Sequence, residues 1–160
     1  MPFPHYAQLD SMDCGPTCLR IIAAFYGRHY SLQNLRDRCH ITREGVSLLG
    51  ISDAAESIGL RSVRVKLTWQ QLRDEANFPC IVHWNQRHFV VVYKIEKKRG
   101  QWWVYVSDPA VGLLKYSERQ FLKSWLQTGA EDSVLQGDLS GDSSAKGIAL
   151  LLEPKPEFYA

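Results

Sequence analysis

The segment that decides the fold runs from residue 14 to residue 27 and reads CGPTCLRIIAAFYG. Its apolar residues Leu19, Ile22, Ala23 and Tyr26 recur every three or four positions, which is the spacing of one face of an α-helix. Pro16 suits the first turn of a helix, and Gly27 is the residue type that most often follows a helix end. The segment therefore predicts an amphipathic helix that begins next to Cys14.

Two more helices are expected downstream. Ser31 and Ser47 are of the residue type that caps helix N-termini. Apolar residues at helical spacing follow each of them: Leu32 and Leu35 in the first case, and Leu48, Ile51, Ala55 and Ile58 in the second. Gly59 is expected to end the third helix.

From Leu60 onward the pattern favours strands. Residues 61–65 alternate as a strand does, and Thr68 is expected to cap a short helix. Strands are predicted over residues 80–84, 88–96, 101–107, 113–116 and 148–152, with a helix starting at Ser117 in a capping box. The short connectors after residues 84 and 96 indicate antiparallel hairpins, because a parallel crossover needs about a dozen residues. Helices first and antiparallel strands after predict an α+β architecture.

Composition bounds the class of protein. The chain has 160 residues, 45% of them hydrophobic and 22% charged, which is typical of one globular domain whose core needs no disulfide or metal. Its 19 basic and 17 acidic residues give a net charge of +2 without a long block of either sign, so nucleic acid is not expected as a partner. The longest apolar stretches, residues 89–93 and 148–152, are too short to cross a bilayer.

The two ends of the chain carry further expectations. Residues 1–6 lack the features of a signal peptide, which predicts a cytosolic domain with cysteines present as thiols. Residues 137–147 are rich in Gly, Ser and Asp, which predicts a loop. The run Pro154-Lys155-Pro156 indicates a departure from the domain, so we expect a domain over 1–153 and the start of a linker over 154–160.

Cys14 occupies the position expected of a nucleophile. At the start of a helix, unpaired N–H groups and the helix dipole favour a thiolate. The alternative is a small buried side chain or a cap. Cys18, Cys39 and Cys80 lie among apolar residues and are expected to be unreactive.

A cysteine nucleophile needs a base and a group that orients the base. If the hairpin turns near Lys98, His88 opens one strand where Asp108 closes its neighbour, and we expect the two side chains to face each other. The alternatives are a hydrogen-bonded hairpin histidine and an Asp-Pro turn. His83 is a rival base without an evident carboxylate partner.

Other polar residues have weaker signals. The side-chain amide of Gln8 could donate to the oxyanion of a tetrahedral intermediate. His5, His29 and His40 are expected at the surface. Cys14 and Cys18 lack the spacing of zinc ligands, so no metal is expected.

Three motifs in order carry a resemblance to a known family: QLDSMDCGPTCL over residues 8–19, HFVVV over 88–92 and DPAVG over 108–112. Together they resemble the peptidase C39 domain, the N-terminal processing domain of ABC transporters that export bacteriocins and related peptides. The match runs from about Tyr6 to Pro154, and GIALLLEP over 147–154 is similar to the family's closing strand. The resemblance implies a papain-like cysteine protease fold and cleavage of a leader peptide after a double-glycine-type site.

By matching position, the resemblance implies that Cys14 is the nucleophile, His88 the base and acid, Asp108 the orienter of His88, and Gln8 the oxyanion donor. It implies no cofactor in this domain, since ATP and Mg²⁺ would belong to a missing nucleotide-binding part. Its partners would be a leader peptide and the transmembrane and ATP-binding parts of one transporter, with oligomers formed only through that transporter. The domain would lie at the cytoplasmic face of a bacterial inner membrane and be soluble in isolation.

Two other functions fit the same residues. One is a docking module that holds an export substrate without cleaving it. The other is an acyl-transfer enzyme that passes a thioester to an amine. The presence of Cys14, His88 and Asp108 favours catalysis over docking. The sequence does not indicate whether water or an amine accepts the acyl group from the thioester.

Overall fold

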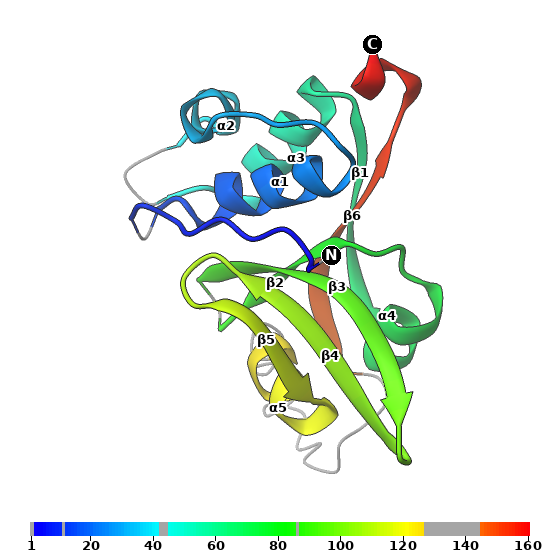
Figure 1. Ribbon diagram of the computed structural model, residues 1–160. Coiled ribbons are helices and arrows are strands. Elements are labelled where there is room, and N and C mark those ends of the chain that lie inside the picture. Colours follow the sequence, from blue (N-terminus) through cyan, green and yellow to red (C-terminus); the bar gives the residue numbers. More distant parts are fainter. Residues whose placement is uncertain (1, 11, 42–44, 86, 127–144) are drawn as a thin grey trace.

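A computed structural model describes residues 2–10, 12–41, 45–85, 87–126 and 145–160. Helices α1 (Cys14–Phe25), α2 (Leu32–Cys39) and α3 (Leu48–Ser57) gather at one end of the molecule, and a curved antiparallel sheet fills the other end (Figure 1). The predicted α+β architecture is confirmed. The functional residues discussed below lie where these two parts meet.

The helix boundaries follow the local signals in the sequence. The Ser31 hydroxyl accepts from the Asn34 N–H, and the Ser47 hydroxyl accepts from the Gly50 N–H, as expected of N-caps. Helix α1 ends two residues before Gly27, which has a φ of +92°.

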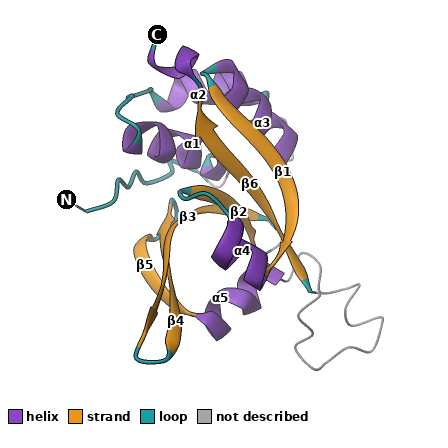
Figure 2. Cartoon of the chain, turned by 90° about the vertical axis from the view of Figure 1, so that its right-hand side faces the viewer, coloured by secondary structure: helices purple, strands orange, loops and turns teal. Residues whose placement is uncertain are grey.

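The sheet contains strands β1 (Leu60–Thr68), β2 (Cys80–Trp84), β3 (His88–Lys98), β4 (Gln101–Asp108), β5 (Gly112–Ser117) and β6 (Lys146–Pro154). Their spatial order is β1-β6-β2-β3-β4-β5, and every neighbouring pair is antiparallel. The strand nearest the C-terminus therefore lies inside the sheet, between β1 and β2. Figure 2 shows β1 and β6 running from the helices at one end toward α4 (Trp69–Glu75) and α5 (Glu118–Trp125) at the other.

Helices α4 and α5 close the open side of the curved strands. Both begin in capping boxes, at Thr68 with Gln71 and at Ser117 with Gln120, as the sequence predicted. Gly147, which we placed at the end of a loop and, by resemblance, at the start of a closing strand, belongs to β6, and a Cβ there would clash with the Trp125 ring. Only glycine allows this close approach. Residues 137–144 of the expected loop lie outside the described part of the chain.

Two hydrophobic cores lie on opposite faces of the sheet. One is formed between the sheet and helices α1–α3, and the other lies among the curved strands, α4 and α5. Phe89 and Val91 of β3 belong to the first core, while Val90 and Val92 belong to the second. Because both faces are covered, the strand reads as a continuous apolar run instead of an alternating one.

The β3–β4 hairpin differs from the predicted register. Lys98 pairs with Gln101, so the turn lies at Arg99 and Gly100, and a β-bulge at Tyr93 then shifts the pairing by one residue. Val91 pairs with Ser107, and the same register places Asp108 beside Val90. The expectation that His88 and Asp108 stand directly opposite each other was therefore wrong; they are diagonal neighbours on the same face.

Residues 154–160, expected to begin a linker, pack against the domain. They form a 3-10 helix over Pro156–Tyr159, and Phe158 is buried. The Lys155 N–H donates to the Gly59 carbonyl at 2.9 Å. Whether a linker follows stays a prediction.

Within the described residues, no helix combines the length and apolar character needed to span a membrane.

Candidate active site

Cys14 is the first residue of α1 and is nearly buried. Asp13 precedes the helix without making a side-chain cap, so the first-turn N–H groups remain available to other partners. Gly15 is required beside the thiol, because a Cβ there would lie 2.8 Å from the Ile51 side chain. The thiol thus lies at the positive end of the helix dipole.

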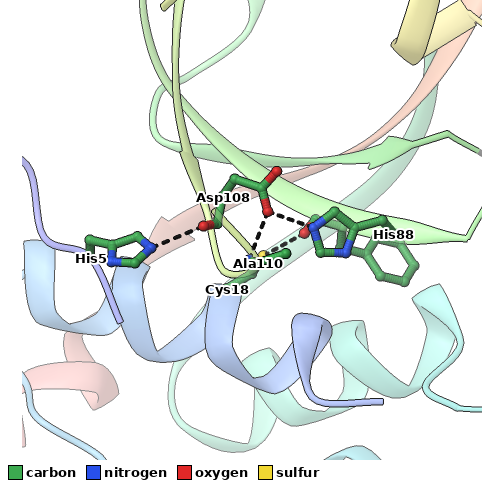
Figure 3. A network of polar contacts seen from close by, with 6 residues as sticks. His5, Cys18, His88, Asp108 and Ala110 are labelled. Carbon is green, nitrogen blue, oxygen red and sulfur yellow. Dashed lines mark hydrogen bonds and ion pairs between the residues drawn. The ribbon is translucent and has the colours of Figure 1, made fainter. Parts of the chain in front are cut away.

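His88 and Asp108 meet next to this helix end. The Nε2 atom of His88 lies 2.6 Å from Oδ1 of Asp108 (Figure 3). The same Oδ1 accepts the Ala110 N–H at 2.8 Å, which fixes the carboxylate. Asp108 is 5% exposed and His88 is 21% exposed, so the contact is largely shielded from water.

The environment of His88 raises its pKa to about 9, from an ordinary value of 6.5. Burial alone lowers this pKa, but hydrogen bonds to Asp108 and Cys14, together with their negative charges, outweigh it. Since Nε2 is taken by Asp108, the other ring nitrogen is left for the thiol. An imidazolium beside a thiol favours the thiolate, which is the nucleophilic form.

The N-terminal segment holds the backbone around Asp108. His5 Nε2 lies 2.9 Å from the Asp108 carbonyl oxygen (Figure 3). The Ser107 hydroxyl donates to the Pro4 carbonyl at 3.1 Å, and the Gln8 N–H donates to the Pro109 carbonyl at 2.9 Å. His5 is therefore a half-buried structural contact and not the surface residue we expected. No periodicity in residues 2–8 signals this role.

Similarity to known proteins agrees with this arrangement. The profile of the peptidase C39 family matches residues 2–130. The chain belongs to the peptidase C39 family. Over 134 residues it is 31% identical to the colicin V secretion/processing ATP-binding protein of Escherichia coli, covering 84% of this chain and 18% of that protein. It is also 32% identical over 126 residues to the pediocin PA-1 transport/processing ATP-binding protein of Pediococcus acidilactici, covering 76% and 17%.

This C39 chain thus spans less than a fifth of the length of these two curated relatives. Among solved structures it is similar to a double glycine motif protease from an AMS/PCAT transporter in complex with the leader peptide. The TM-score is 0.76 at 28% identity, with 95% of this chain and 91% of that chain covered. The peptidase domain of Streptococcus ComA gives 0.74 at 26%, covering 96% and 100%. The predicted papain-like fold is confirmed.

Gln8 of the C39 motif lies beside the loop that follows Asp108, to which its backbone is bonded. Its side-chain Oε1 is buried and has no hydrogen-bond partner among the described residues. A buried carbonyl oxygen without a partner is costly unless a donor completes it. The structure brings Cys14, His88 and Asp108 together, with Gln8 bonded to the residue after Asp108; the catalytic role of each stays a prediction.

The remaining cysteines of the C39 chain have environments that oppose ionisation. Burial raises the pKa of Cys39 and of Cys80 to about 12. Burial, with the negative charges of Cys14 and Asp108, also raises the pKa of Cys18, whose Sγ donates to the Phe89 carbonyl at 3.4 Å. Cys14 differs from these three cysteines in lying at the start of α1 beside His88.

Two alternatives from the sequence can also be checked, the rival base His83 and a metal site. His83 lies on β2 opposite Phe89, and its ring stacks on Phe89 with centroids 5.0 Å apart. Within the part of the chain that the structure describes, no three His, Cys, Asp or Glu residues are arranged to hold a metal ion.

Proposed function

We propose that this domain is a cysteine endopeptidase that removes the leader peptide of a secreted precursor after a double-glycine-type site. The observation that carries the proposal is the 2.6 Å contact of His88 with Asp108 beside Cys14 at the start of α1. It is the nucleophile, base and orienter arrangement that thiol proteases use.

The chemistry runs in two steps. The Cys14 thiolate attacks the carbonyl carbon of the second glycine, and the developing oxyanion is held by the Gln8 amide and a backbone N–H. His88 then donates its proton to the departing amine, which leaves a thioester. A water molecule gives a proton to His88 and adds to the thioester, releasing the leader and regenerating the thiol. Asp108 keeps the His88 ring oriented throughout.

The proposed substrate class, precursors with a double-glycine leader, is inferred from the descriptions of similar proteins. One similar structure is described as a double glycine motif protease in complex with a leader peptide, and the curated relatives are described as processing and transport proteins. Glycine residues lack a Cβ, so they fit a narrow cleft that excludes other side chains. A helical leader would add binding energy away from the reacting bond.

The domain would act as one part of a larger exporter. We propose that it is joined to transmembrane and ATP-binding parts and works at the cytoplasmic face of a bacterial inner membrane. ATP and Mg²⁺ would bind those parts, and this domain would need no cofactor of its own. Any oligomer would form through the complete transporter.

The direct test is incubation of the domain, under reducing conditions, with synthetic precursors whose leaders end in Gly-Gly, followed by mass spectrometry. Cleavage after the second glycine is expected with the wild-type chain and not with Cys14→Ala. Binding of the leader without cleavage would indicate a docking module. Transfer of the leader to an added amine would indicate an acyl-transfer enzyme.

Alkylation tests the nucleophile without a substrate. Iodoacetamide near neutral pH is expected to modify Cys14 faster than Cys18, Cys39 or Cys80, whose pKa values burial raises. His88→Ala should slow modification of Cys14, because the imidazolium beside the thiol is then missing. Equal rates at all four cysteines in the folded protein would contradict the assignment.

A further inference from the structure

The residue before the nucleophile carries a buried charge. Asp13 has no exposed surface, although its side chain is a carboxylate. Its Oδ2 accepts the Asp10 N–H at 3.3 Å, and Nε of Arg36 lies 3.1 Å from its Oδ1. Oδ1 has no directed hydrogen bond among the described residues, so the contact with Arg36 is an ion pair. A buried charge is retained only where it has such a partner.

Asp10 and Asp13 together close the turn that leads into α1. The Asp13 N–H donates to the Asp10 carbonyl at 3.1 Å, and the Met12 N–H donates to Oδ1 of Asp10 at 2.7 Å. Hydrogen bonds of Asp10 therefore hold the turn together, and the ion pair of Asp13 with Arg36 joins the turn to helix α2. Since Cys14 follows directly, the direction of its thiol depends on this turn.

The charge of the Asp13 carboxylate lies one residue before the thiol in the chain. A carboxylate shielded from water disfavours a second negative charge nearby. Arg36 supplies the positive charge that cancels it, and its side chain is only 35% exposed, which limits screening by water. The other titratable or charged groups around the turn and the thiol are Asp10 from the turn, Cys18 from α1, His88 from β3 and Asp108 from β4.

We propose that Asp13 and Arg36 form a positioning pair for the nucleophile. Arg36 holds the buried Asp13 carboxylate, and with it the turn before Cys14, and compensates the negative charge that Asp13 places one residue before the thiol. The proposal rests on Cys14 being the nucleophile of the proposed peptidase. Both residues act through Cys14 and neither contacts the substrate.

The test compares four variants with wild type: Arg36→Gln, Arg36→Lys, Asp13→Asn and the double variant Asp13→Asn/Arg36→Gln. Arg38→Gln is the matched control, because Arg38 lies on the same helix and bonds Asn34 and Ser57 at the surface. The rate of Cys14 alkylation by iodoacetamide is followed by peptide mass spectrometry at pH 7 and at pH 10. kcat and KM on a Gly-Gly precursor and the unfolding midpoint are measured beside it.

Arg36→Gln is expected to alkylate about tenfold more slowly than wild type at pH 7, because the unpaired carboxylate opposes the thiolate. The difference should become smaller at pH 10, because high pH ionises cysteine thiols in general. The double variant should recover most of the rate, Arg36→Lys should stay near wild type, and Arg38→Gln should match wild type. kcat should fall by about 10- to 100-fold in Arg36→Gln with KM unchanged, since the turn is displaced.

A double variant as slow as Arg36→Gln, or an Arg36→Gln rate equal to wild type at pH 7, would overturn the proposal. If Arg36→Gln does not fold, Asp13→Asn decides: it should alkylate at least as fast as wild type at pH 7, because Arg36 is then unopposed, and a slower rate would overturn the proposal. Alkylation needs no substrate. The pair can therefore be supported even if no precursor is cleaved, which would count against the proposed function alone.

Discussion

His88 and Asp108 are diagonal neighbours on β3 and β4, and their side chains span the diagonal to meet at 2.6 Å. The bulge at Tyr93 makes this possible, because without the extra residue the hairpin register would place them on opposite faces of the sheet. The contact uses Nε2 of His88. It therefore fixes which ring nitrogen remains for Cys14.

Replacing Asp108 with Asn tests the orienting role of the carboxylate. An amide keeps the size of the side chain but stabilises the imidazolium poorly and can select the wrong tautomer, so kcat is expected to fall by at least about 100-fold. The fold should be retained, because the Asn oxygen can still accept the Ala110 N–H, but the unfolding midpoint should fall at neutral pH, where the charge that stabilises protonated His88 is lost. Kinetics on a Gly-Gly precursor and chemical denaturation measure both. A lower unfolding midpoint with an unchanged kcat would indicate a purely structural aspartate.

The raised pKa of His88 predicts a pH-dependent stability. Because the folded-state pKa is about 9 and the ordinary value is 6.5, protonated His88 stabilises the fold fully below about pH 6.5. This contribution is lost as the pH rises through about 9. The difference in unfolding midpoint between wild type and His88→Asn should therefore shrink between pH 6 and pH 10. His29→Asn, at an exposed site, should show no such trend, and a constant difference for His88→Asn would refute the prediction.

Gln8 is expected to act on the transition state and not on binding. Gln8→Ala removes the side-chain amide but keeps the backbone N–H that donates to Pro109. We expect kcat to fall by about 100-fold with KM nearly unchanged, which is typical of the loss of one oxyanion donor. Leu9→Ala is the control, since Leu9 is 79% exposed. An equal effect of both substitutions would show that the segment matters only as a structural element.

The segment after β6 should contribute to stability. Phe158 is 1% exposed and Tyr159 is 57% exposed. Phe158→Ala is expected to lower the free energy of unfolding by about 3–5 kcal/mol, and Tyr159→Ala by much less. Gly59→Ala should also destabilise, since a Cβ there would lie 2.5 Å from the Phe158 backbone nitrogen and Gly59 has a φ of +95°. Urea denaturation compares the three variants; equal losses for Phe158 and Tyr159 would mean that this segment is not docked in solution.

Local signals predicted most of the helices and strands. Caps at Ser31, Ser47, Thr68 and Ser117 are decided within a few residues, and the structure confirms each of them. The order of strands was not predictable, because the position of β6 between β1 and β2 depends on contacts between distant segments. The hairpin register was misplaced because the turn lies at Arg99 and Gly100 and not near Lys98. The bulge at Tyr93, which no glycine or other turn residue marks, then shifts the pairing by one residue.

The site shows the same division. Cys14, His88 and Asp108 could be proposed because each lies at the end of an element that the sequence marks. The contacts of His5 with Asp108 and of Arg36 with Asp13 join segments without any shared pattern. Their side chains are ordinary surface types in sequence, and only the fold reveals what they touch.

The inner position of β6 has a consequence for biosynthesis. Leu150 and Leu152 of β6 belong to the same core as Cys14 and α1, and they are made last among the strands. A nascent chain that has not yet released residues 146–154 lacks the strand that joins β1 to β2. Helix α1 is then without part of its support. Cys14, His88 and Asp108 are therefore expected to come together only after nearly the whole domain has been translated.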